Sequence, residues 1–212
     1  VHETSNPLSA MMAHLEMLQS DFAQDPMVSN RLKVLMSHLE RVIGILTHAR
    51  QVALPPSEEP EPVRVVDTLR SVVSLVGSHY RTMGVLLTLE LPSREVVVTG
   101  SAPRLQQVWL NLLKNGFDAI KAKPSGTINI KLTHRTPMEP VEVRITDDGI
   151  GMSPEVLEKL KEEPDFFTTK PEGLGLGIAE SRRILREHHG TLHYEGRPGK
   201  GTTAVVRLPA VS

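Results

Sequence analysis

The sequence contains no cysteine, few aromatic residues and no long apolar segment. Without cysteine the chain can form neither a disulfide framework nor zinc-thiolate sites, and its composition is compatible with the reducing cytoplasm. No apolar run approaches the roughly 18 residues that a membrane-spanning helix needs, and no signal-peptide pattern is visible. We therefore expect a folded cytoplasmic protein, and a full-length protein attached to a membrane is compatible with this expectation.

The chain also lacks an excess of charge of either sign. Lys and Arg together number 24 and Asp and Glu 25, which gives a formal net charge of -1. A nucleic-acid-binding domain usually carries a basic patch or stripe, so we expect no nucleic-acid partner. The 212 residues, 39% of them hydrophobic, suffice for one large domain or two small ones.

Residues 1–53 are predicted to form a helical hairpin, because apolar residues recur there at alternating spacings of three and four. These residues are Leu8, Met11, Leu15, Leu18 and Phe22 in the first helix, and Val28, Leu32, Leu35, Leu39, Val42, Leu46, Ala49 and Ala53 in the second. Asp25 and Pro26 supply a capping residue and a proline at the first helical position, so the turn is expected near residues 23–25.

Such a hairpin has one apolar seam on each helix and cannot enclose a core alone. Pairing of two copies gives a four-helix bundle, and we therefore predict a homodimer. In the alternative arrangement, the hairpin packs against the C-terminal domain of its own chain.

The segment at residues 54–62, LPPSEEPEP, is rich in proline and glutamate and is expected to form an extended linker to a domain at 63–212. Strands are predicted in this domain at 63–67, 85–91, 96–100, 127–135, 141–147, 191–196 and 202–209, and helices at about 68–79, 102–122 and 174–188. This mixture predicts an α/β sandwich with helices against one face of a sheet.

The helix at about 102–122 carries Asn111, Asn115 and Asp118 on one stripe. A polar row on a helix is most often a solvated face. Two carboxamides in such a row are less ordinary, because asparagine is a middling helix former without a charge to solvate it. A carboxamide oxygen is also a good ligand for magnesium.

Two glycine-rich stretches follow. ITDDGIGM, at 145–152, ends a predicted strand with two aspartates, and an aspartate fixed at a strand end can accept a hydrogen bond from an amino group on a flat ring. A plain turn is the alternative, and an EF-hand is disfavoured because its acidic spacing is missing. GLGLGIAES, at 173–181, leads into a helix whose exposed N–H groups suit phosphate. A dinucleotide-binding loop is not favoured, since Glu180 occupies its last glycine position.

The stretch HETSN, at residues 2–6, differs by one residue from the zinc-protease pattern H-E-x-x-H. Asn6 is a poor substitute for the second histidine and no third ligand is apparent, so a zinc site is not favoured. The heptad positions place His2, Glu3 and Asn6 on the outward face of the first helix, with His2 and Asn6 one helical turn apart. A visiting site could therefore reach both side chains.

Five motifs in order, HETSNPL, NLLKNGFDAI, DDGIGM, DFFTTK and GLGLGI, resemble the H, N, G1, F and G2 boxes of bacterial two-component sensor histidine kinases. GKGTT, at 199–203, is similar to a final glycine-threonine box, and FFTTK together with HETSNPL resembles the nitrogen-regulation class of that family. The resemblance implies a dimeric four-helix bundle for dimerisation and phosphotransfer, followed by an α/β sandwich of the gyrase and histidine-kinase ATP-binding type.

The resemblance also implies ATP-dependent autophosphorylation of His2 and transfer of the phosphoryl group to a response-regulator aspartate. Glu3, beside His2, would polarise the imidazole or accept its proton. By family position, Asn6 would orient water for dephosphorylating the regulator. The implied cofactors are ATP and Mg²⁺, and the implied partners are a second copy of the chain, a response-regulator receiver domain and a sensor domain upstream of this sequence.

Position by position, the resemblance implies that Asp147 binds the adenine amino group, that Asn115 ligates magnesium and that Asn111 assists at the metal or phosphate. The remaining implied positions are Gly149 and Gly151 at the adenine pocket, Gly173, Gly175 and Gly177 beside the phosphates, Lys170 near the γ-phosphate, and a lid at about 152–172 anchored by Phe166 and Phe167.

Some positions depart from the family pattern. Gly116 and Phe117 stand where alanine and a small or variable residue are common, and Leu174 stands where threonine is frequent. One alternative function is an ATPase of the same fold without histidine phosphotransfer, but those enzymes carry a catalytic glutamate where this chain has Asn111, which cannot act as a base. A non-catalytic dimeric scaffold is the other alternative, and the presence of His2, Asn115 and Asp147 argues against it.

Overall fold

The structure is a computed structural model that describes residues 11, 14–15, 17–19, 21–22, 24–32, 34–36, 38, 60–120, 123–136, 138–162 and 176–211. The chain divides into two compact units. One unit comprises Val1–Ser57 and Lys170–Leu174, and the other comprises Glu58–Thr169 and Gly175–Ser212. Among the described residues, no helix is both long enough and apolar enough to cross a membrane.

In the first unit, the described residues between 11 and 21 and between 26 and 38 are helical. Asp25 Oδ1 accepts hydrogen bonds from the backbone N–H groups of Met27 (3.0 Å) and Val28 (3.1 Å). Asp25 is therefore an N-cap residue, and Pro26 is the first helical residue after it, as the sequence predicted.

The apolar seam of the hairpin is partly exposed in the single chain. Phe22 is 47% exposed and Leu35 52%, whereas Leu32 is 7% exposed. The other seam residues with large exposed side chains are Met11 and Leu18.

The second unit is built on a five-stranded sheet with the strand order β2-β4-β5-β7-β6. The strands are β2 (Val85–Glu90), β4 (Gly126–Thr133), β5 (Val141–Asp147), β6 (Thr191–Gly196) and β7 (Thr202–Leu208). β2 and β4 are parallel, and the other neighbours are antiparallel. A separate two-stranded sheet pairs β1 (Glu61–Arg64) with β3 (Val97–Gly100).

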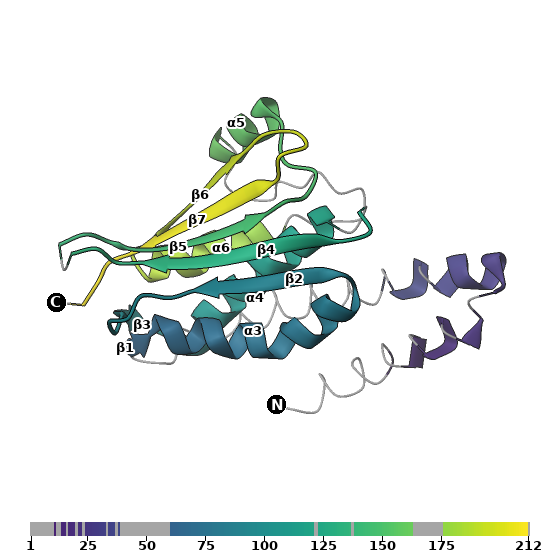
Figure 1. Ribbon diagram of the computed structural model, residues 1–212, viewed down its shortest axis with the longest axis horizontal. Coiled ribbons are helices and arrows are strands. Elements are labelled where there is room, and N and C mark those ends of the chain that lie inside the picture. Colours follow the sequence, from purple (N-terminus) through teal and green to yellow (C-terminus); the bar gives the residue numbers. More distant parts are fainter. Residues whose placement is uncertain are drawn as a thin grey trace. The chain divides into compact units, whose positions relative to one another are not determined.

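Three helices cover one face of the larger sheet (Figure 1). They are α3 (Val65–Thr82), α4 (Ala102–Ile120) and α6 (Leu176–Glu187), and a shorter helix, α5 (Pro154–Glu162), lies near β6. Every second residue of the strands faces these helices, so that side chains such as Ile130, Val143 and Val206 are fully buried. The predicted α/β sandwich with helices on one face is confirmed.

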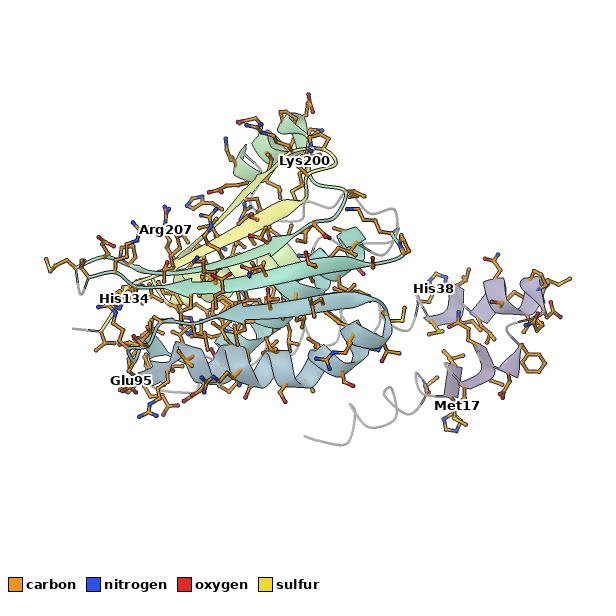
Figure 2. All side chains as sticks on the ribbon, in the orientation of Figure 1. Met17, His38, Glu95, His134, Lys200 and Arg207 are labelled. Atoms are coloured by element: carbon orange, nitrogen blue, oxygen red, sulfur yellow. The ribbon has the colours of Figure 1, made fainter. Side chains whose placement is uncertain are left out.

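The opposite face of the sheet is polar, and cross-strand pairs connect its side chains. Arg207 on β7 donates to Glu142 on β5 at 2.9 Å, and the Thr146 and Thr203 hydroxyls are 3.0 Å apart. In Figure 2, His134 and Lys200 mark the two ends of this sheet.

Side-chain hydrogen bonds fix the position of α4 in the helical layer. Trp109 is completely buried and its Nε1–H donates to the Thr68 hydroxyl of α3 at 2.9 Å. His188, at the end of α6, accepts the backbone N–H of Ser101 through Nε2 at 2.9 Å, and its Nδ1 lies 2.7 Å from the Ile184 carbonyl. Since a carbonyl can only accept, Nδ1 is the donor in this contact, and Nε2 is the acceptor for Ser101. α4 is thereby tied to a helix on each side.

Two sequence predictions of local structure were wrong. The segment at 63–67 was predicted as a strand, but β1 ends at Arg64 and α3 already begins at Val65. Val65 is fully buried and its carbonyl accepts the Thr68 hydroxyl at 2.8 Å, so tertiary packing overrides the strand preference of valine. Glu61 and Pro62, which were assigned to the linker, belong to β1.

The second error was the omission of α5 from the segment predicted as a lid. Ser153 precedes this helix, and its hydroxyl accepts the Val156 N–H at 3.3 Å. Ser-Pro at the start of a helix is a capping residue followed by proline at the first position, a signal that could have predicted α5.

Candidate functional site

Asp147 is the last residue of β5 and lies beside α4, with its side chain only 7% exposed. Its Oδ1 accepts the backbone N–H groups of Gly149 (2.8 Å) and Thr202 (3.3 Å). No hydrogen bond to Oδ2 is present within the part of the chain that the structure describes. Burial raises the pKa of this carboxyl above its usual value, while the two backbone hydrogen bonds oppose the increase. One oxygen is thus held by the protein and the other is available as an acceptor.

Three glycines allow the backbone to close around Asp147. A Cβ on Gly201, whose φ is +79°, would lie 1.9 Å from the Asp147 carbonyl oxygen. A Cβ on Gly151, whose φ is +72°, would lie 1.9 Å from the Arg197 carbonyl oxygen, and one on Gly149 would lie 2.7 Å from the Ala119 backbone of α4. Glycine is therefore required at these positions by the protein's own packing.

Asp148, the second aspartate of the pair, binds Thr127 of β4. Asp148 is exposed, and its carboxylate accepts the backbone N–H and the hydroxyl of Thr127, both at 3.1 Å. These bonds fix the start of β4 against the loop that follows β5. The family resemblance pointed to Asp147 in this pair, and among the described residues Asp148 is engaged with Thr127 while Asp147 keeps one oxygen without a hydrogen bond.

Asn111, Asn115 and Asp118 lie on α4 and are all half-buried. The Asn111 Nδ2 group is 3.5 Å from the Gly177 carbonyl and 3.4 Å from the Ser181 hydroxyl, both on α6. Asn115, one turn further along α4, forms no side-chain hydrogen bond with the residues that the structure describes. The polar stripe on α4 thus contacts the start of α6 at Asn111, one helical turn before Asn115.

The two unusual residues after Asn115 have clear packing roles. A Cβ on the buried Gly116 would lie 3.4 Å from Asp147 Cβ and 3.3 Å from Ile128 Cδ1, so the missing side chain lets β5 approach α4 closely. Phe117 stacks on Tyr80 of α3 with a ring-centroid distance of 4.3 Å. Burial, followed by the Asp118 charge, raises the pKa of Tyr80 to about 12.

Several predicted site residues lie outside the described residues. They are His2, Glu3 and Asn6 at the N-terminus, and Phe166, Phe167, Lys170, Gly173, Leu174 and Gly175 between α5 and α6. Gly177 is described and lies in the first turn of α6. Among the residues that the structure describes, a Cβ on Gly177 would meet Asn111 Cγ at 4.0 Å and nothing closer, so these residues do not require glycine there.

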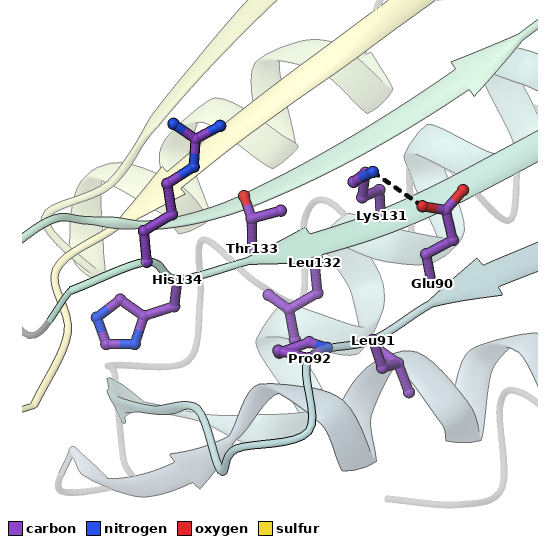
Figure 3. Close-up of a pocket in the computed structure, with 8 residues that line it drawn as sticks. Glu90, Leu91, Pro92, Lys131, Leu132, Thr133 and His134 are labelled. Carbon is purple, nitrogen blue, oxygen red and sulfur yellow. Dashed lines mark ion pairs between the residues drawn. The ribbon is translucent and has the colours of Figure 1, made fainter.

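A shallow hollow is present at the other end of the sheet, at the C-terminal ends of β2 and β4 (Figure 3). A 2.9 Å ion pair between Lys131 and Glu90 spans strands at its edge, and Leu91, Pro92 and Leu132 supply apolar walls. Both ring nitrogens of His134 are buried and form no hydrogen bond with the residues that the structure describes. Asp147 pairs with Ile128 near the start of β4, so the two places are separated by the length of that strand.

Comparison with known proteins gives a family match for the second unit. The family model described as histidine kinase-, DNA gyrase B-, and HSP90-like ATPase matches residues 100–212. This range contains Asn111, Asn115, Asp147 and the glycines around them.

The full chain is similar to bacterial signalling kinases. Sporulation kinase B of Bacillus subtilis (strain 168) is 29% identical over 210 residues, which cover 99% of this chain and 48% of the relative. Sporulation kinase E of the same organism is 31% identical over 209 residues, covering 98% of this chain and 27% of the relative. AtoS, a signal transduction histidine-protein kinase of Escherichia coli (strain K12), is 27% identical over 208 residues, which cover 98% of this chain and 33% of the relative. The chain thus spans less than half the length of these three relatives.

Solved structures agree with the fold. The nucleotide-free catalytic domain of histidine kinase ThkA has a TM-score of 0.62 at 27% identity, covering 72% of this chain and 96% of that one. ThkA in complex with the response regulator protein TrrA has a TM-score of 0.68 over 99% of this chain and 62% of that one. At 21% identity, the second match shows the fold alone. The chain belongs to the histidine kinase-, DNA gyrase B- and HSP90-like ATPase family, and its relatives are sensor histidine kinases whose catalytic domain this family describes.

Proposed function

We propose that the chain is the kinase part of a two-component sensor protein, which uses magnesium-ATP to phosphorylate His2 and then transfers the phosphoryl group to a response-regulator aspartate. The observation that carries this proposal is Asp147, a buried carboxylate with one oxygen fixed by two backbone N–H groups and the other free. An acceptor that is fixed in this way can select the amino group of adenine.

The residues beside Asp147 suit the rest of a magnesium nucleotide. Magnesium is usually held by one or two protein oxygens together with substrate phosphates and water. The described residues contain no cluster of three or more His, Cys, Asp or Glu side chains that could hold a metal. We assign the carboxamide oxygen of Asn115 to the ion as its protein ligand, with Asn111 assisting at the metal or phosphate. When bound, the ion would neutralise charge on the phosphates.

His2 is the proposed nucleophile. A neutral imidazole is available near pH 7, because its unperturbed pKa is about 6.5. Transfer requires an in-line approach of this nitrogen to the γ-phosphate but little other covalent chemistry. Glu3, the next residue, would accept the imidazole proton as the phosphorus–nitrogen bond forms and ADP leaves.

The exposed seam of the hairpin supports a homodimer as the acting species. Phe22 and Leu35 lie on the predicted seam and are about half exposed in one chain. A second hairpin would bury these side chains in a four-helix bundle. We further propose that the protein belongs to the nitrogen-regulation class, that Asn6 supports dephosphorylation of the regulator, and that a sensor domain outside this sequence controls the kinase in the cytoplasm.

Incubation of the protein with γ-labelled ATP and magnesium tests this proposal. We expect label on the protein that is lost in acid and retained in alkali, as phosphohistidine requires, and no label on the His2→Gln variant. Label that survives His2→Gln, or label that is stable in acid, would contradict the assignment.

A second measurement separates the kinase from an ATPase. Release of inorganic phosphate by His2→Gln at the wild-type rate, without label on either protein, would favour hydrolysis over phosphotransfer. Addition of a response-regulator receiver domain should remove label from the wild-type protein. A receiver domain whose acceptor aspartate is replaced by asparagine is the matched control and should leave the label in place.

A further inference from the structure

The side chain of Ser181, on α6, contacts Asn111 on α4, one of the two asparagines in the proposed magnesium and phosphate site. Ser181 is fully buried and lies one helical turn after Gly177. Its hydroxyl donates to the Gly177 carbonyl at 2.7 Å and accepts from Asn111 Nδ2 at 3.4 Å. The same Nδ2 group also faces the Gly177 carbonyl at 3.5 Å. Three polar groups thus form one closed triangle between α4 and α6.

The hydrogen bonds of this triangle favour one orientation of the Asn111 carboxamide. The serine hydroxyl has a single proton, and the short bond to the Gly177 carbonyl uses it. The Ser181 oxygen can therefore only accept from Asn111. The Gly177 carbonyl can likewise only accept. Rotation of the amide by 180° would place Oδ1 against a carbonyl oxygen, with no proton between them.

This orientation has a consequence for the other end of the amide. With Nδ2 directed to α6, Asn111 Oδ1 is directed away from α6, and it accepts no hydrogen bond from the described residues. The two Nδ2 contacts are long, so each one is weak and the orientation depends on both. Loss of the Ser181 hydroxyl should therefore let the amide rotate.

We propose that Ser181 is a positioning residue, which fixes the Asn111 carboxamide with its nitrogen on α6 and its oxygen free for the metal or phosphate. This inference rests on the proposed function only for the identity of the ligand. The orientation itself is a property of the protein without nucleotide, and it can be measured separately.

The first test uses the nucleotide-free protein. The side-chain amide protons of Asn111 are observed by NMR with ¹⁵N-labelled asparagine and assigned by their loss in Asn111→Ala. We expect these protons to exchange with solvent at least about fivefold faster in Ser181→Ala than in the wild type, as loss of one hydrogen bond implies. Ser74→Ala, at an exposed position of α3, makes the same chemical change and should leave the rate unchanged. Equal exchange rates in Ser181→Ala and the wild type would overturn the proposal.

The second test measures the affinity of the same proteins for a non-hydrolysable ATP analogue. Ser181→Ala should lose about fivefold in affinity with magnesium and less than twofold with the metal chelated. In an Asn111→Ala background, Ser181→Ala should cause no further loss of the affinity for the analogue that depends on magnesium. An equal loss with and without magnesium, or an additive loss in the double variant, would assign Ser181 a structural role only.

The two tests separate this inference from the proposed function. If none of the proteins binds the analogue, the proposed function is wrong, and the exchange measurement still decides whether Ser181 orients Asn111. Because alanine is a strong helix former and smaller than serine, Ser181→Ala should fold, and an unchanged melting temperature relative to Ser74→Ala checks this point.

Discussion

The candidate site has two halves, one around Asp147 and one at the start of α6, and they differ in how tightly the described residues pack around them. Around Asp147, a single Cβ on Gly151 or Gly201 would collide with a backbone oxygen at 1.9 Å. At the start of α6, a Cβ on Gly177 would meet nothing closer than 4.0 Å among the described residues. The proposed adenine side is thus built by contacts within the protein, whereas the described residues leave room on the proposed phosphate side.

This difference indicates how the two halves would work. A rigid acceptor such as Asp147 selects by geometry, since its carboxylate cannot turn without breaking two backbone hydrogen bonds. On the proposed phosphate side, a metal ion with its waters and a transferring group would need such space. Substitutions of the tightly packed glycines around Asp147 should therefore act through folding, whereas substitutions of groups that meet the nucleotide should act through binding.

The largest expected effect is that of Gly201→Ala. The new Cβ would combine a left-handed backbone with a collision against the Asp147 carbonyl, and we expect the free energy of unfolding to fall by more than about 3 kcal/mol, with loss of nucleotide binding. Denaturant unfolding measures this change.

Gly199→Ala is the matched control, because its φ of +72° is similar but nothing lies within 4 Å of the new Cβ. Gly199→Ala should lower the free energy of unfolding by only about 1 kcal/mol, because only the left-handed backbone conformation disfavours alanine there. Equal costs for the two variants would mean that the packing around Asp147 is not tight.

Asp147→Asn should have the next largest effect, and on binding alone. The asparagine oxygen can still accept the Gly149 and Thr202 N–H groups, but its NH₂ group would then face the amino group of adenine. We expect nucleotide affinity to fall about 100-fold, as loss of a hydrogen bond to a charged group permits, while the free energy of unfolding at pH 7 stays equal or rises. Calorimetric titration and denaturant unfolding of both proteins test this expectation.

The pH dependence of stability gives Asp147 a separate signature. Its pKa in the folded protein is raised from the ordinary 3.8, so the folded state binds more protons than the unfolded state between these two values. The free energy of unfolding of the wild type should therefore decrease relative to Asp147→Asn as the pH rises through this interval. A difference that does not vary with pH would contradict the burial of an ionisable carboxyl.

Sequence patterns predicted most of this architecture but only part of the site. The strands at 141–147 and 191–196 have the predicted bounds, because alternating apolar residues there face a single buried layer. The pattern could not show that Val65 begins a helix, since valine also fits a strand and only packing decides. It also could not detect Ser181 or the hydrogen bonds of Asp148, because hydrogen bonds between distant segments leave no local signal.

Gly177→Ala should have a moderate effect on the open half of the site. In the first turn of α6, the added methyl group has room in the protein and alanine is the better helix former, so the free energy of unfolding should rise by 0 to about 1 kcal/mol. The methyl group would nevertheless occupy space beside Asn111 that we assign to the phosphates. We expect affinity for the ATP analogue to fall about tenfold, the reverse of a folding defect. Unchanged affinity would mean that the phosphates do not approach this turn.

The smallest expected effect is that of Phe117→Leu, which probes the side of α4 that faces α3 and not the nucleotide. Leucine keeps most of the buried apolar surface but removes the stacking on Tyr80, which is worth about 1 kcal/mol in such pairs. The free energy of unfolding should fall by about this amount, and Tyr80→Leu alone should cost more, because it removes the ring that is more deeply buried. In the double variant, the combined cost should be less than the sum of the single costs, since the stacking can be lost only once. Additive costs would show that the two rings pack independently, and the aromatic pair would then not help to hold α4 in position against α3.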